Sequence, residues 1–319
     1  MQDYFESIGG TEKLSKTQKY ELALKAALAI KQLHDQDILH CDIKPENFML
    51  DWQGDIAVVE AIDFGVSMVL LKGQTNITLT QIKGTPDFMA PEICVFERYE
   101  NGQLVDPFIV LSAGRIYSKA SDVYALGILF AGDLGISEEL GKQDELLVSL
   151  VTRMIDVNPK ERPSMDEVVS AFFLGQYITA KKELREESIG VHNILDPKIV
   201  TLDLEIATID KLRNSLLEYF ANPKSNDSRN DTIDDILFEI TNHQNTSEDT
   251  TSPTDGSFYI KLLQSLPVEL RDGVCNKLGI EKGSSLLIET SDTAKKELET
   301  KIRDYRQKEL DSPAASTLH

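Results

Sequence analysis

The sequence predicts a mainly α-helical α+β protein, and three observations support this fold class. Apolar residues recur at helical spacing between Ser15 and Asp35. The run from Val123 to Phe130 is apolar on all sides, which is typical of a fully buried helix. Two short β-like runs, "FML" and "IAVVEAI", flank a turn at residues 51–55. The predicted strand content is therefore small beside the predicted helices.

The expected helices have recognisable ends. Ser15 and Gln18 form a capping box at the start of the helix that runs to Asp35. An apolar stripe at residues 147–154 predicts a second helix, and a cap at Ser164 begins a third. Up to about residue 178, the pattern indicates one helix-rich unit with a small β element.

The second half of the chain has a different character. An amphipathic helix is expected at residues 209–220, followed by a stretch rich in Asn, Asp, Ser and Thr. Helices are expected again at residues 267–278 and 294–305. We therefore predict a first domain at residues 1–178, a helical extension at 179–220, a flexible linker at 221–257 and a small helical C-terminal region at 258–319.

Composition narrows the classes of function. The 319 residues contain 33 Lys and Arg against 53 Asp and Glu, a net charge of −20, which disfavours nucleic acid and anionic membranes as partners. The three cysteines are far apart and predict no disulfide framework or zinc site. The longest apolar run, at residues 123–131, is much shorter than the roughly 18 residues of a membrane-spanning helix. The N-terminus is acidic where a signal peptide is basic. A cytoplasmic protein is expected.

The segment "HCDIKPENFML", His40 to Leu50, carries the residue types that phosphoryl transfer needs. Asp42 and Asn47 are five residues apart with Lys44 between them, and Asp63 follows in "DFG". In such chemistry a carboxylate orients the accepting hydroxyl, oxygen ligands hold magnesium on the nucleotide, and a cation meets the moving phosphoryl group. Each short pattern alone is also typical of an ordinary surface turn.

Five motifs together resemble the protein kinase family, in that family's order. "HCDIKPEN" resembles the catalytic loop, "DFG" the magnesium-binding motif, and "GTPDFMAPE" the end of the activation segment. "SDVYALG" resembles the buried helix that supports the catalytic loop, and "NPKERPS" supplies Arg162, which pairs in this family with the residue equivalent to Glu92. The resemblance covers about the first 175 residues. It implies a kinase-like large lobe with a C-terminal helical extension.

The resemblance also implies a role for each site residue. Asp42 would be the catalytic base, and Lys44 would contact the transferred phosphate of ATP. Asn47 and Asp63 would bind Mg²⁺. Lys44, with Thr85 in the "GTP" segment, resembles serine/threonine kinases, so a protein serine or threonine is the expected acceptor. Further expectations concern the adenine, which would lie on Met49, and the internal spine of the lobe, which would contain His40, Phe64 and Asp122.

Two departures from the family pattern affect the expected activity. The catalytic loop usually reads His-Arg-Asp, and the arginine can bind a phosphorylated activation segment, but Cys41 is neutral and forms no charge-assisted bond to phosphate. Activity is therefore expected not to depend on phosphorylation of Thr75, Thr78 or Thr80. Cys41 could also be redox-sensitive, although burial of a small side chain is favoured.

The second departure concerns the small lobe. The sequence contains no glycine-rich loop, strand lysine or helix glutamate before residue 40, and its opening resembles the segment that joins the two lobes. The small lobe is expected to be missing, or to be supplied by a partner protein. Without it, we expect weak ATP binding and little turnover.

Several interpretations stay open. The first is a serine/threonine protein kinase that uses ATP and Mg²⁺ on a protein substrate. The second is a non-catalytic interaction protein with a kinase-like lobe. A small-molecule phosphotransferase ranks last, because it would not be expected to carry "GTPDFMAPE". The Glu-rich C-terminus faintly resembles secretion signals of bacterial effectors delivered into host cells, although a solvated helical face is favoured.

Overall fold

The structure is a computed structural model of the chain. It describes residues 1–53, 56–94, 98–100, 103–106, 115–136, 145–189, 196–221, 226–243, 256–281, 284 and 291–310. These residues form a mainly helical protein with small sheets, so the predicted α+β class is confirmed. The chain separates into two compact units, Met1–Gln176 and Tyr177–His319.

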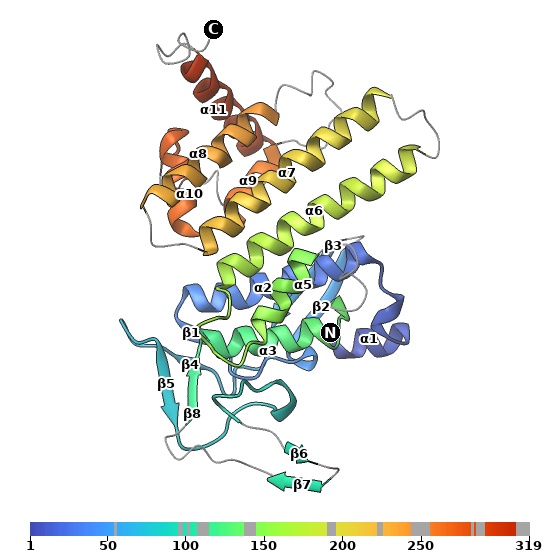
Figure 1. The fold of residues 1–319 in the computed structure, drawn as a ribbon, viewed down its shortest axis with the longest axis vertical. Helices are drawn as coiled ribbons and strands as arrows, with labels where there is room; N and C mark the ends of the chain where they lie inside the picture. The colour runs from blue at the N-terminus through green and yellow to red at the C-terminus, as the bar shows by residue number, and fades with distance from the viewer. Residues whose placement is uncertain are drawn as a thin grey trace. The chain divides into compact units, whose positions relative to one another are not determined.

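The first unit contains short helices at its start and longer ones around its core (Figure 1). The division between the units falls within α6. In chain order the helices are α1 (Gln2–Ile8), η1 (Thr11–Lys13), α2 (Lys16–Asp35), η2 (Pro45–Asn47), η3 (Pro86–Phe88), α3 (Lys119–Ala131), α5 (Glu145–Met154) and α6 (Met165–Ile189).

The described strands of this unit pair into two-stranded antiparallel sheets. β1 pairs with β4, β2 with β3, β5 with β8, and β6 with β7. The strands are β1 (Ile38–Leu39), β2 (Phe48–Gln53), β3 (Ile56–Ala61), β4 (Met68–Val69), β5 (Asn76–Leu79), β6 (Arg98–Glu100), β7 (Gln103–Asp106) and β8 (Arg115–Ser118).

The core of the first unit is built on α2 and α3. The predicted capping box is present at the start of α2, where Ser15 and Gln18 satisfy each other's backbone amides. α2 packs against β1, β3 and α3, and α3 also packs against α5. Aromatic rings fill the interior, with Phe130 and Phe172 at 5.0 Å between ring centroids. This packing fixes β1, and with it the start of the segment that follows.

The second unit is helical in its described residues. α8 contacts α7, α10 and α11, and α9 also contacts α11. The Tyr177 and Phe258 ring centroids lie 4.3 Å apart, and the buried Lys181 forms an ion pair with the buried Glu205. After the end of α6, its helices are α7 (Pro197–Ala221), α8 (Asn226–His243), α9 (Gly256–Ser265), α10 (Val268–Lys277) and α11 (Asp292–Leu310).

Part of the segment predicted as a flexible linker, residues 221–257, is helical. α8 occupies residues 226–243, and residues 222–225 and 244–255 lie outside the described part. The polar composition favoured a linker, but Ile233, Ile236, Leu237 and Ile240 are buried at helical spacing and form an apolar stripe. The four-part domain division otherwise stays a prediction.

Candidate active site

A buried carboxylate on α3 holds the start of the segment His40–Asn47 in place. Asp122 is 3% exposed and accepts hydrogen bonds from the backbone amides of His40 (2.8 Å) and Cys41 (3.0 Å). The Nε2 atom of His34, on α2, lies 3.0 Å from the same carboxylate. Two helices therefore determine the path of the loop before it reaches Asp42.

Cys41 has a backbone conformation that few non-glycine residues adopt. Its φ of 67° is in the left-handed region, and the two amide contacts of Asp122 hold the loop in that conformation. Burial, with a further contribution from the negative charge of Asp122, strongly raises the pKa of the Cys41 thiol. A thiol with a raised pKa is a poor nucleophile, so the geometry favours the structural interpretation of Cys41 over the redox-sensitive one.

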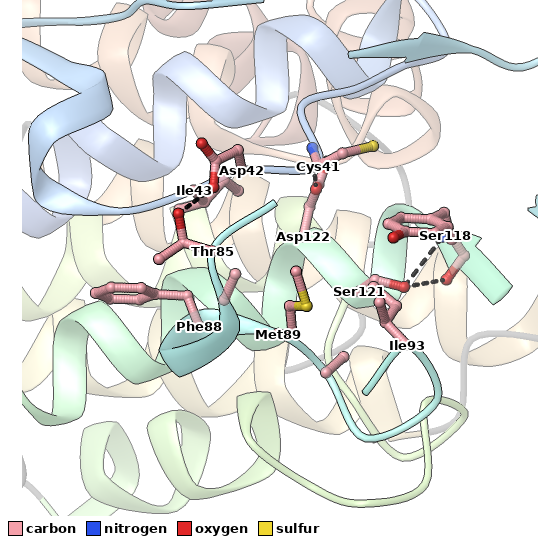
Figure 2. Close-up of a pocket in the computed structure, with 13 residues that line it drawn as sticks. Cys41, Asp42, Ile43, Thr85, Phe88, Met89, Ile93, Ser118, Ser121 and Asp122 are labelled. Carbon is pink, nitrogen blue, oxygen red and sulfur yellow. Dashed lines mark hydrogen bonds between the residues drawn. The ribbon is translucent and has the colours of Figure 1, made fainter. Parts of the chain in front are cut away.

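Asp42 lies at the centre of a polar cluster. The Thr85 hydroxyl donates to one carboxylate oxygen (2.6 Å), and the Asn47 side-chain amide donates to the other (2.9 Å) and to the Asp42 carbonyl (2.7 Å). The Lys44 ammonium lies 3.4 Å from the carboxylate and donates to the Thr85 hydroxyl (2.8 Å). Figure 2 shows Asp42 and Thr85 pointing toward each other across the two segments.

These contacts favour the ionised form of Asp42. Burial alone raises the pKa of the carboxyl group, but the hydrogen bond from Thr85, the charge of Lys44 and the hydrogen bond from Asn47 together outweigh it. The pKa of Asp42 is therefore lower than its ordinary value. An ionised carboxylate can accept a hydrogen bond from an incoming hydroxyl group.

Asn47 belongs to this cluster, and Asp63 follows a residue whose backbone is bonded to Asn47. The Asn47 side-chain nitrogen makes both hydrogen bonds to Asp42, so these bonds do not use its side-chain oxygen. The Asn47 backbone carbonyl accepts a hydrogen bond from the Ile62 amide (2.9 Å), and Asp63 is the residue that follows Ile62. Asp63 is exposed, has a φ of 62°, and accepts from the Gly65 amide (3.2 Å). One anionic and one neutral oxygen donor fit Mg²⁺, which takes few protein ligands beside water and phosphate.

The residues expected in the internal spine are neighbours. The His40 and Phe64 ring centroids lie 5.6 Å apart, and the His40 backbone is bonded to Asp122. Phe64 itself is 51% exposed, and Met49 on β2 is 52% exposed. Two apolar side chains, Phe64 directly after Asp63 and Met49 on β2, are therefore accessible to a ligand.

The segment Gly84–Glu92 returns to the loop and is fixed at both ends. At its end, Arg162 forms a two-pronged ion pair with Glu92 (2.7 and 2.8 Å), and its guanidinium carbon lies 4.9 Å from the centre of the Tyr124 ring. The Arg162 side chain is fully buried. The pair expected from the sequence is thus present, and its burial indicates a role in the fold.

A small pocket lies between the loop, this segment and α3. Asp42 and Thr85 line it on one side, and apolar side chains such as Met89 and Ile93 line the other (Figure 2). The pocket also contains the paired hydroxyls of Ser118 and Ser121, 3.4 Å apart. The polar cluster is therefore backed by a mostly apolar wall.

The structure brings Asp42, Lys44, Asn47 and Thr85 into direct contact. Asp63 is linked to them through the backbone hydrogen bond between Ile62 and Asn47, and Met49 lies on β2, outside these contacts. Sequence reasoning missed His34 as a partner of Asp122, 88 residues away, because a histidine in a helical pattern carries no signal of a distant carboxylate. Within the described residues, no group of three or more His, Cys, Asp and Glu side chains could hold a metal ion, and no helix is long and apolar enough to cross a membrane.

Comparisons with known proteins agree with the motifs. Residues 1–135 match the family model described as Protein kinase domain. The chain is 27% identical over 189 residues to "Ovarian-specific serine/threonine-protein kinase Lok" from Drosophila melanogaster, covering 51% of this chain and 35% of that protein. It is 30% identical over 145 residues to "Calcium-dependent protein kinase 27" from Arabidopsis thaliana, covering 44% and 29%.

A yeast protein gives a third match of similar identity and coverage. The chain is 29% identical over 192 residues to "Serine/threonine-protein kinase TOS3" from Saccharomyces cerevisiae, covering 56% of this chain and 30% of that protein. The chain thus spans about a third of the length of these curated relatives. β-strands occur within the matched residues, and the expectation that a small lobe is missing stays a prediction.

Proposed function

We propose that this chain, with a protein kinase domain match in residues 1–135 and distant serine/threonine kinase relatives, transfers the γ-phosphate of ATP to a serine or threonine of a protein substrate. The observation that carries the proposal is the contact between Asp42, Lys44 and Thr85, which joins two segments 43 residues apart at one carboxylate. A structural turn needs no such convergence of a carboxylate, a cation and a hydroxyl group.

Each residue of the cluster has a part in the proposed reaction. Asp42 orients the substrate hydroxyl and accepts its proton as the oxygen attacks the γ-phosphorus, and the bond from that phosphorus to ADP breaks, so that ADP leaves. Lys44 supplies positive charge to the transferred group, and Thr85 holds the side chains of both. Asn47 and Asp63 would hold Mg²⁺, which supplies charge neutralisation on the nucleotide phosphates when bound. Met49 would lie against the adenine.

The test is phosphate transfer from labelled ATP to a generic protein substrate, with the full chain and excess Mg²⁺. We expect slow transfer that falls by at least about a hundredfold in Asp42→Asn, because this substitution removes the anionic acceptor while keeping the shape. Asp51→Asn is the control, since Asp51 is exposed on β2 and lies outside the cluster. Equal activity of the Asp42→Asn variant and the wild type would contradict the proposal.

A second candidate function rests on exposed apolar side chains. Met49, Ile62 and Phe64 are 52%, 36% and 51% exposed, and such residues gather at protein contacts. A non-catalytic interaction protein would explain them. This candidate gains support if the chain shows neither transfer nor Mg²⁺-dependent ATP binding by calorimetry, and it loses support if Asp63→Asn weakens ATP binding only in the presence of Mg²⁺.

The remaining partners follow from the proposed reaction. The substrate is a protein, and a second protein could complete the nucleotide site by supplying a small lobe. A cytoplasmic location, where ATP and Mg²⁺ are both present, fits the proposal.

A further inference from the structure

The stretch that leads to Thr85 is paired to the strand before α3. β5 and β8 pair antiparallel from Asn76 opposite Ser118 to Leu79 opposite Arg115. Just beyond the last pair, the Arg115 guanidinium donates to the Thr80 carbonyl. The strand pairing joins backbone groups and the Arg115 side chain binds a backbone carbonyl, so neither contact needs a modified side chain.

Tyr117 on β8 continues this attachment beyond the sheet. Its hydroxyl accepts a hydrogen bond from the Lys83 amide (2.7 Å) and donates to the Lys83 carbonyl (3.0 Å). The Tyr117 side chain is 1% exposed, and its ring belongs to an apolar cluster with Leu39 and Met89. One buried hydroxyl thus satisfies both backbone groups of a single residue, which fixes the two peptide units on either side of it.

Lys83 is followed directly by the residues that contact the loop at Cys41 and the polar cluster around Asp42. Gly84 lies so close to the loop that a Cβ atom there would be 2.3 Å from the Cys41 carbonyl oxygen. Thr85 then donates its hydroxyl to Asp42 (2.6 Å). A continuous set of contacts therefore runs from Tyr117 through the backbone of residues 83–85 to the Asp42 carboxylate.

Cys41 supplies no charge that could bind a phosphate on this segment. Its thiol is neutral, and the segment is already attached through β5, Arg115 and Tyr117. We propose that Tyr117 is a positioning residue, which holds the Thr85 segment against Asp42 and makes the site independent of phosphorylation at Thr75, Thr78 and Thr80. The inference rests on the proposed function for its catalytic part and on the structure alone for its positional part.

The positional part is tested with Tyr117→Phe in the full chain, because this variant keeps the ring in its apolar cluster and removes the hydroxyl alone. We expect hydrogen exchange in peptides covering residues 80–90 to become about tenfold faster, as two hydrogen bonds are lost, with exchange in α2 and α3 unchanged. Tyr259→Phe is the matched control. Tyr259 is 2% exposed, and its hydroxyl has no hydrogen-bond partner among the described residues.

The catalytic part is tested by the kinetics of phosphate transfer. In Tyr117→Phe, kcat is expected to fall roughly tenfold to a hundredfold while the KM for ATP stays within about twofold, because the change misplaces Thr85 and leaves the nucleotide contacts intact. A variant with alanine at Thr75, Thr78 and Thr80 is expected to keep the wild-type kcat. Those three side chains are exposed and lie outside the cluster.

The outcomes separate this inference from the proposed function. Unchanged exchange at residues 80–90 in Tyr117→Phe overturns the positional role, and loss of activity in the triple alanine variant overturns the independence from phosphate. If the wild type shows no transfer, the proposed function fails, and the exchange measurement still decides the positional role. If Tyr117→Phe does not fold, exchange of the Lys83 amide in the wild type replaces it, because this amide donates to the Tyr117 hydroxyl. Strong protection of this amide is the expected result, and its exchange at the rate of an unprotected amide overturns the positional role.

Discussion

Asp42 has more partners than a carboxylate in a surface turn requires. Thr85, Asn47 and Lys44 all direct donors toward it, and together they outweigh the effect of burial on its pKa. Of the three, only Thr85 comes from a separate segment of the chain. Its hydrogen bond therefore forms only when that segment lies against Asp42. The ionisation of Asp42 is thus coupled to the position of residues 83–85.

This coupling predicts the effect of Thr85→Ala on the pH profile. Loss of the hydrogen bond raises the pKa of Asp42 from its lowered value toward the ordinary one, so the acidic limb of the activity profile moves to higher pH. A lowered pKa stabilises the fold above the ordinary aspartate range, and that stabilisation disappears as the pH falls through the lowered value. Thr85→Ala should therefore cost about 1 kcal/mol of unfolding free energy at neutral pH and less in acid.

The pKa of Asp42 can be measured directly by carboxyl NMR titration. Thr85→Ser should retain the wild-type pKa, because the serine hydroxyl can donate the same hydrogen bond. Thr78→Ala is a second control, since Thr78 is exposed on β5. An Asp42 pKa that is the same in Thr85→Ala and in the wild type would show that the hydrogen bond does not determine it.

The residues of the cluster could be named from the sequence, whereas two of their supports could not. Asp42, Lys44, Asn47 and Asp63 lie within 21 residues of each other and carry a recognisable pattern. The contact between His34 and Asp122 joins positions 88 apart, and the contact between Tyr117 and Lys83 joins positions 34 apart. Neither residue type predicts such a partner, because both histidine and tyrosine are also common in ordinary cores.

At the scale of elements, apolar periodicity predicted the helices that cover the core and missed those with weaker patterns. α2, α3 and α10 agree with the expected ranges to within a few residues, since caps or apolar runs mark them. α8 was missed because polar residues dominate its composition. The pairing of β5 with β8 was missed as well, because the pattern of a short exposed strand does not reveal its partner.

The close approach of two elements at Gly84 gives a second prediction. Its φ is +104°, and a Cβ atom would meet the Cys41 carbonyl oxygen at 2.3 Å, so Gly84→Ala must displace one segment from the other. We expect a loss of about 2–4 kcal/mol in unfolding free energy, measured by chemical denaturation, together with faster exchange at residues 80–90.

Gly73 provides the matched control for this substitution. Its φ is +82°, but no atom of the described residues beyond its chain neighbours lies within 4 Å of the position of an added Cβ. Gly73→Ala therefore carries only the cost of the left-handed backbone, about 1 kcal/mol. The difference between the two variants isolates the contact with Cys41. Equal costs would mean that the loop and the segment are not held together at this point.

For the molecule as a whole, the family match and the proposed chemistry belong to the first unit, and the second unit has its own core. In the first unit Leu126 is fully buried on α3, and in the second Leu263 is fully buried on α9. Composition did not predict the second core, because polar residues separate its apolar stripes along the chain. Two cores in one chain allow the units to differ in stability.

This arrangement predicts that core substitutions act within their own unit. Leu263→Ala should cost about 2–5 kcal/mol and should accelerate hydrogen exchange across α7, α8, α9 and α11, while α2 and α3 keep their protection. Leu126→Ala should give the reverse pattern and should also abolish the proposed phosphate transfer, because Asp122 on α3 holds the backbone at His40 and Cys41. If either substitution accelerates exchange equally in all helices, the two units unfold as one, and the second unit then contributes to the stability of the site.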